Sequence, residues 1–250
     1  MKAWLRLRRR LTAFLLAVPL LIALGALCFE GSLLYTRHQA RRFLREVQEL
    51  KVGDSSTAEV EVLLREYGGW SKPSNDSPCS APDCTVYGVL VRSEPMEYLL
   101  WARWAILHMR QLLTHQWVTV GYGRVLGMVA YVAKGRVVDI SLGMMCRKWD
   151  DAVVQGKVHE WARIPEGLEF RQLRKGYAPT FYVMSGGEGG MGIEAMIDFR
   201  ASSEDRRHAF DLNLRCMWTL SGCSDMRSLM PSVWKDAQEY HRQQTPPSQP

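Results

Sequence analysis

Cysteines are the residues of this chain whose types and spacing most directly suggest chemistry. Cys79 and Cys84 have four residues between them in a loop rich in proline and serine, and Cys216 and Cys223 flank the turn-sized segment MWTLSG. Because a turn can close either spacing, we predict the disulfides Cys79–Cys84 and Cys216–Cys223, with Cys146 left as a buried free thiol. The alternative pairing is Cys146–Cys216, since both residues fall at the ends of expected strands.

The same cysteine spacings do not fit a metal or redox site. Zinc sites usually combine C-x2-C or Cys/His pairs on tight turns. Here the spacings are C-x4-C and C-x6-C with no histidine nearby, and a redox C-x-x-C motif is absent from the sequence. We therefore expect structural cysteines and no bound metal ion.

Histidine and glycine motifs do not indicate a cofactor either. His108 and His115 lie seven residues apart, which separates them by about 10.5 Å along a helix, too far to bind one metal ion. Gly187, Gly189 and Gly192 form a literal G-x-G-x-x-G. A dinucleotide site needs a helix after that motif, whereas an alternating strand follows here. We interpret the glycines as a hairpin connection and predict no cofactor.

Acid–base candidates are few and scattered. His208 and Asp211 fall in one expected strand, on opposite faces because their separation is odd. His159 and Glu160 have no partner that the sequence identifies. No nucleophile elbow G-x-S-x-G occurs, so we predict no catalytic residue. A hydrolase would have to assemble serine, histidine and aspartate from distant positions, and it is the alternative hypothesis.

An apolar segment near the N-terminus must position everything that follows it. Residues 11–29 carry no charge and would span about 28 Å as a helix, close to the thickness of a bilayer's hydrocarbon core. Pro19 is tolerable in a membrane helix. The arginines before this segment favour a cytoplasmic N-terminus. We expect a basic cytoplasmic segment over 1–10 and an uncleaved, single-pass transmembrane helix over 11–34 that contacts the lipid bilayer.

Two other fates of this segment are less consistent with the sequence. A signal peptide could be cleaved at the small residues of Ala23-Leu24-Gly25. However, the apolar run continues past that site. A lipoprotein would use Cys28, but the preceding Leu27 is not a small residue.

Net charge argues against a nucleic-acid partner. The formal net charge is +6, and residues 1–50 carry this whole excess, with nine basic and three acidic side chains. The remaining 200 residues are balanced. A nucleic-acid-binding domain would need its basic excess on the folded part, where it can follow phosphates.

Periodicity predicts an α+β domain over 51–243, with a juxtamembrane stalk helix over 35–50 before it and a disordered tail over 244–250. Two or three helices would pack on a mostly antiparallel sheet. The helix over 97–115 has apolar residues on most of its faces and is expected to be well buried. A hairpin should turn at Lys134-Gly135. Residues 147–178 are too mixed to assign. The expected helices are 57–67, 97–115 and 232–242, and the expected strands are 85–91, 118–133, 137–145, 180–185, 191–200 and 208–215.

Residues 50–68 carry a resemblance to a known family. A hydrophobic-x-x-Gly turn leads through serine and threonine into a helix with valine and paired leucines, then glycine. The matching positions are Val52, Gly53, Ser56, Thr57, Val60, Leu63, Leu64 and Gly68. This segment resembles the opening of the small outer-membrane lipoprotein subunit of the β-barrel assembly machinery. The chain lacks that family's lipobox and the Gly-x-Pro after the helix. The resemblance implies an envelope-associated scaffold that binds proteins and has no catalytic residue.

These observations predict a location and a class of function. We expect a protein of the inner (cell) membrane, with its N-terminus cytoplasmic and most of the chain periplasmic or extracellular. It would be a non-enzymatic binding or scaffold module whose partners are envelope proteins. Nine tryptophans are more than usual for this length. Core packing accounts for most of them, and exposed ones would mark a binding surface for protein or glycan.

Overall fold

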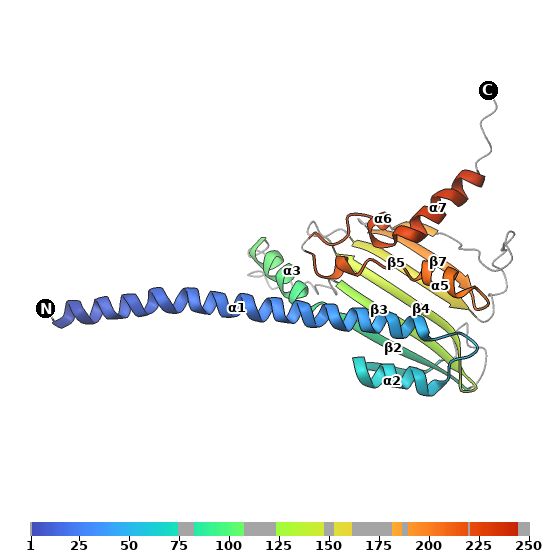
Figure 1. Ribbon diagram of the computed structural model, residues 1–250, viewed down its shortest axis with the longest axis horizontal. Coiled ribbons are helices and arrows are strands. Elements are labelled where there is room, and N and C mark those ends of the chain that lie inside the picture. The colour runs from blue at the N-terminus through green and yellow to red at the C-terminus, as the bar shows by residue number, and fades with distance from the viewer. Residues whose placement is uncertain are drawn as a thin grey trace, which may run out of the picture.

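Helix α1 (Lys2–Glu49) is the longest element of the protein. The computed structural model describes residues 2–74, 83–107, 124–147, 153–161, 182–186, 190–219 and 221–244. Figure 1 shows the N-terminal part of α1 extending alone, whereas its C-terminal part lies along the sheet. The expected membrane segment and stalk helix therefore form one continuous helix.

Exposure changes along α1 as an anchor requires. Leu16 and Leu27 in the apolar part are 73% and 69% exposed, whereas Phe43 and Val47 in the last turns are fully buried. Among the described helices, α1 alone is long and apolar enough to cross a membrane. The helix is thus compatible with a single-pass membrane anchor or a signal sequence.

Strands of the described ranges form one mixed sheet, which confirms the mixed α/β composition and the mostly antiparallel pairing. The strand order is β1-β2-β3-β4-β5-β7-β6, and every neighbouring pair is antiparallel except β5 and β7. The strands are β1 (Gly69–Pro73), β2 (Cys84–Arg92), β3 (Arg124–Ala133), β4 (Arg136–Arg147), β5 (Val153–Trp161), β6 (Tyr182–Gly186) and β7 (Gly190–Asp198).

Helices contribute the second layer of the fold. Besides α1 they are α2 (Thr57–Tyr67), α3 (Glu94–Leu107), α5 (Ser203–Ala209), the 3-10 helix η1 (Leu214–Met217), α6 (Met226–Leu229) and α7 (Pro231–Gln244). One buried apolar cluster joins α1, α2 and the C-terminal helices to a single face of the sheet. Along β3 this face is made by every second residue, namely Leu126, Met128, Ala130 and Val132.

Local signals explain the parts of the fold that the sequence predicted correctly. The backbone N–H of Ser56 donates to the Glu59 carboxylate at 2.6 Å, which caps the start of α2. Lys134 and Gly135 both have positive φ angles, 53° and 76°, and join β3 to β4 in a two-residue turn. Such turns match the twist of an antiparallel hairpin.

One predicted strand was wrong, and two observed strands were not predicted. The expected strand over 208–215 is instead the end of α5 followed by η1. Ser202 accepts a hydrogen bond from the Asp205 N–H and starts this helix, and that capping outweighed the alternating apolar pattern. Strand β5 occupies part of the segment that was left unassigned. Strand β1 occupies residues that were assigned to a polar loop.

Other elements differ from their predictions at their limits. Helix α3 begins at Glu94, three residues before the predicted start at residue 97. Strand β3 begins at Arg124, and the remainder of the predicted strand over 118–133 lies outside the described residues. The last six residues of the expected tail lie outside them as well.

A buried arginine fastens the end of α1 to the sheet. The Arg206 Nε of α5 donates to the Glu160 carboxylate of β5 at 2.7 Å. The same guanidinium donates to the backbone carbonyls of Gln48 and Leu50, at the C-terminal end of α1. The last turn of α1 contains no basic residue of its own, so Arg206 supplies the positive charge that this end of a helix favours.

Removing one partner of this pair should destabilise the domain strongly. We expect Arg206→Met to lower the free energy of unfolding by about 3–5 kcal/mol, because Glu160 would keep a buried charge without its partner. Denaturant unfolding of the full chain in detergent measures this change. The control is Arg200→Met, which breaks an exposed ion pair with Asp198 and should cost no more than about 1 kcal/mol.

The double variant Arg206→Met/Glu160→Leu tests the physical reason. Replacing a whole buried ion pair by apolar residues is often neutral or better. We expect this variant to recover much of the stability that Arg206→Met loses. Equal losses in the single and double variants would contradict the account based on an unpaired buried charge.

Candidate functional site

A groove beside α1 is the candidate binding site among the described residues. Its volume is about 480 Å³, and it lies between α1, the end of α2, strands β1 and β2, and the start of α3. The side chains that give it its character are Tyr35, Gln39, Tyr67, Trp70, Arg92 and Glu94.

Two glycines shape the floor of this groove. Gly69 and Gly88 lie on the paired strands β1 and β2. A Cβ at Gly69 would meet the Gly88 carbonyl oxygen at 2.4 Å, and a Cβ at Gly88 would meet the Trp70 ring at 2.4 Å. The Trp70 ring therefore lies directly over Gly88, where no other residue type leaves room for it.

The lining of the groove combines aromatic rings with hydrogen-bonding groups. Tyr35 and Trp70 are 63% and 45% exposed, so both rings are available to a ligand. The Gln39 amide donates to the Tyr35 hydroxyl at 2.7 Å. Burial, and then the Glu46 carboxylate, raises the pKa of Tyr67 well above its usual value, so its hydroxyl keeps its proton. A concave surface with aromatic rings and several hydrogen-bonding groups can orient a bound ligand.

A polar cluster lies on the other face of the sheet. Asp139 of β4, Lys157 and His159 of β5, and Glu194 of β7 alternate with core residues of their strands, so they share the face away from the helices. The His159 Nε2 lies 2.7 Å from Asp139 Oδ1, and its Nδ1 lies 3.6 Å from Glu194 Oε1. Lys157 Nζ lies 3.1 Å from the same Glu194 oxygen.

Charge in this cluster favours a protonated histidine. Burial lowers the pKa of His159, but hydrogen bonds with Asp139 and Glu194 outweigh it, so the net pKa is raised. Burial raises the pKa of Asp139, with His159 opposing the effect. Burial also acts to raise the pKa of Glu194, but His159 and Lys157 more than offset it, so the net pKa is lowered. Both ring nitrogens face carboxylates, so His159 links β5 to β4 and to β7. Neither nitrogen is available to act as a general base.

The other acid–base candidates, His208 and Asp211, contact Asp236 and Ser232 of α7. We call these four residues the α5–α7 clasp. His208 Nδ1 lies 2.9 Å from the Asp236 carboxylate of α7, and the Ser232 hydroxyl donates to Asp211 at 2.6 Å. The prediction that His208 and Asp211 lie on opposite faces of a strand was wrong, because both contact α7. No hydrogen bond joins His208 to Ser232 in the described part of the chain, so these residues do not form a catalytic triad.

The described residues contain one of the two predicted disulfides and the predicted buried thiol. Cys216 and Cys223 form a disulfide with 4.9 Å between their Cα atoms. Cys146 is a buried free thiol, which leaves no place for the alternative pairing Cys146–Cys216. Burial, opposed by Arg124, raises the pKa of Cys146 to about 12, so it is a poor nucleophile. Cys79 lies outside the described residues, so its pairing with Cys84 stays a prediction.

Some residues that the sequence singled out lie outside the described ranges, and some partners of His159 were not predicted. His108, His115, Gly187 and Gly189 lie outside the described ranges, whereas Gly192 lies in β7. The sequence analysis missed Asp139 and Glu194 as partners of His159. Alternation in VVQGKVHEW could have indicated β5, but its buried Glu160 interrupts the apolar face.

Comparisons with known proteins give no family for this chain. No protein-family model, no curated protein and no solved structure matches it. The resemblance of residues 50–68 to the assembly-machinery lipoprotein stays a prediction.

The raised pKa of His159 predicts a pH dependence of stability. A raised histidine pKa stabilises the fold below its unfolded value of 6.5, and this contribution is lost as the pH rises through the folded value. We expect the free energy of unfolding to fall over that window, and the melting temperature to fall with it.

Two variants test this assignment by thermal unfolding at a series of pH values. His159→Gln should flatten the decline above pH 6.5. His38→Gln changes an exposed histidine of α1 and should leave the decline unchanged. If the melting temperature of His159→Gln declined with pH as steeply as that of the wild type, another group would be the cause of the pH dependence.

Proposed function

We propose that this protein is a membrane-anchored extracytoplasmic binding module that holds a polypeptide partner of the cell envelope in the groove beside α1. The groove itself is the observation that carries the proposal. It combines exposed aromatic rings, an amide and the charged side chains of Arg92 and Glu94, and no nucleophile next to a general base is found among its described lining residues. Such a lining suits recognition better than bond cleavage.

An edge strand beside the groove favours a polypeptide as the ligand. Strand β1 lies at one end of the strand order, and all five of its residues are exposed. Edge strands offer backbone N–H and C=O groups to an added strand, while neighbouring pockets take alternate side chains. Trp70 and Lys72 project on one face of β1 and could contact such side chains.

The anchor helix would keep this groove close to the membrane. Groove residues of α1 run from Ser32 to Gln39, which places them about 5–15 Å beyond Phe29 along the helix. A partner held there would itself lie near the bilayer surface. We propose an inner-membrane location with a cytoplasmic N-terminus, supported by the arginines before the apolar segment and by a disulfide, which persists in oxidising compartments.

The alternative, an anchored hydrolase, has less support. Asp139 and His159 resemble the pair that orients a base in such enzymes. However, the second ring nitrogen of His159 faces Glu194. The hydroxyl of Ser232, the serine of the α5–α7 clasp, donates to Asp211 rather than to a histidine.

The proposed topology predicts protease sensitivity from outside the cell. In spheroplasts with an intact inner membrane, an added protease should digest the bulk of the chain and leave a fragment near the N-terminus. An N-terminal tag on the cytoplasmic side should stay protected until detergent is added. A full-length chain that resists external protease would contradict the extracytoplasmic location.

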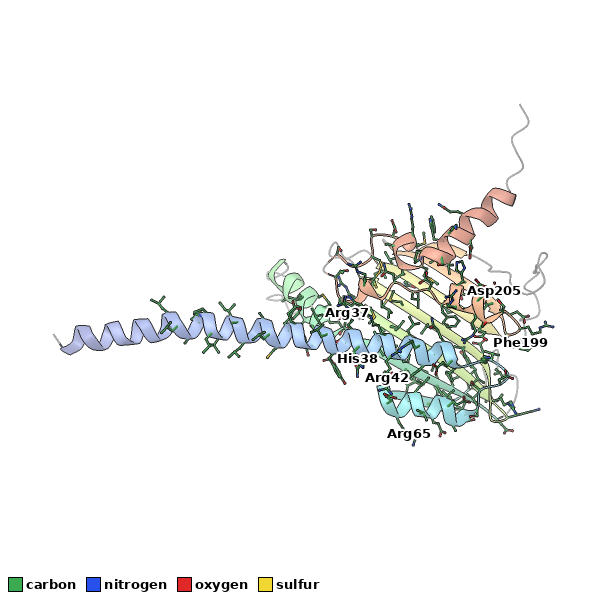
Figure 2. The ribbon with its side chains drawn as sticks, viewed as in Figure 1. Arg37, His38, Arg42, Arg65, Phe199 and Asp205 are labelled. Carbon is green, nitrogen blue, oxygen red and sulfur yellow. A yellow bond between two sulfur atoms is a disulfide. The ribbon has the colours of Figure 1, made fainter. Side chains whose placement is uncertain are left out.

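The proposed groove predicts a site-specific crosslink in intact cells. A photoreactive amino acid in place of Gln39 should give a discrete protein adduct, because this side chain lines the groove. The same amino acid in place of Arg65 is the control. Arg65 is exposed on the opposite side of α2, where Figure 2 shows it pointing away from the domain.

A pair of glycine variants then tests whether groove shape matters. Gly88→Ala should displace the Trp70 ring and weaken the adduct, since a Cβ there would lie 2.4 Å from that ring. Gly143→Ala is the matched control on β4, where a Cβ would make only ordinary contacts at 3.7 Å or more. Equal adducts from both variants, or from both photoreactive positions, would argue against the groove as the binding site.

A further inference from the structure

Exposed apolar side chains gather where the domain faces the N-terminal part of α1. Leu34 and Tyr35 of α1 are 59% and 63% exposed, and Leu90 of β2 and Trp70 of β1 are 39% and 45% exposed. They continue the exposed apolar surface of α1, on which Leu27 is 69% exposed. Large exposed apolar surfaces mark interaction sites rather than ordinary solvent-facing surface.

Helix α3 extends from this end of the domain. It follows β2 directly and contacts α1. Figure 1 shows α3 projecting beyond the sheet toward the N-terminal half of α1. Its first turn is fixed to the domain, because Met96 is 3% exposed, but Tyr98 is already 70% exposed. The prediction of a well-buried helix was therefore wrong at Tyr98.

The composition of α3 is that of a helix in contact with lipid. After Glu97 it reads YLLWARWAIL, with Arg103 as its single charged residue. Tyrosine and tryptophan are enriched at the boundary between hydrocarbon and water, and arginine is compatible with headgroup depth. Its 14 residues span about 21 Å, which is too short to cross a bilayer but, with apolar residues on most faces, suits shallow insertion among the lipids beside the anchor.

We infer that α3 is a second membrane contact, which lies in the lipid interface beside the anchor and holds the domain against the bilayer. This inference rests on the proposed membrane anchor. If the apolar part of α1 is in lipid, the end of that part marks the interface, and α3 lies beside it. Position and composition then both favour lipid over a protein ligand as the occupant of the exposed side of α3, whereas the neighbouring groove with Tyr35 and Trp70 remains the site proposed for the polypeptide.

Lipid photocrosslinking of the full chain tests this contact. The protein is reconstituted in vesicles of phosphatidylcholine and phosphatidylglycerol, with a benzophenone amino acid at one position at a time. Position 98 tests α3. Position 22, which is 68% exposed in the apolar part of α1, reports the anchor. Position 199 is the matched aromatic control, because Phe199 is 40% exposed at the opposite end of the domain (Figure 2).

We expect lipid adducts, identified by mass spectrometry, at positions 22 and 98 and only background at position 199. Unchanged melting temperatures of the three variants show that each is folded. Adducts at 22 but not at 98 would overturn the second contact and leave the anchor intact. Protein adducts instead of lipid adducts at 98 would assign this surface to a protein partner or a second copy. Absence of adducts at 22 would remove the anchor and, with it, this inference.

Discussion

The Arg206 guanidinium at the end of α1 is the interaction on which the arrangement of this molecule depends. It links three elements that are distant in sequence: the carbonyls of Gln48 and Leu50, the Glu160 carboxylate and the helix α5. Burial raises the pKa of Glu160 although Arg206 opposes it. The free-energy cost of removing both charges from water therefore offsets much of the stabilisation from the ion pair, as is common for buried pairs. Its main contribution is to fix where α1 ends relative to the sheet.

A fixed end of α1 determines what the rest of the helix can do. The helix continues without a break from its buried last turns into its exposed apolar part, so the direction of the domain relative to that part is set by the helix itself. The Arg42 guanidinium adds a contact to Glu66 of α2 at 2.5 Å, which holds α2 and the start of the groove against α1. The groove and α3 thus occupy fixed positions along α1, rather than moving on a flexible linker.

Local signals allowed some elements to be predicted, and long-range partners explain those that were missed. The turn at Lys134-Gly135 and the capped start of α2 depend on neighbouring residues, so the sequence shows them directly. Strand β5 and helix α5 carry Glu160 and Arg206 in buried positions, where patterns based on apolar residues expect none. Each residue is acceptable there only because of the other, 46 residues away. The groove was missed because its shape depends on the close approach of Gly69 to Gly88 across two strands, which no local pattern indicates.

Strand β5 also explains why the polar cluster lies where it does. Its pairing with β7 is parallel, so no hairpin fixes the register between them, and a connection elsewhere in the chain must bring the two strands together. The ion pairs that Lys157 and His159 make with Glu194 join these strands on one face, and His159 also reaches Asp139 of β4. On the other face Glu160 holds Arg206. Polar side chains on both faces of one central strand thus specify its position, because a shift by one residue would exchange the two sets and leave both without partners.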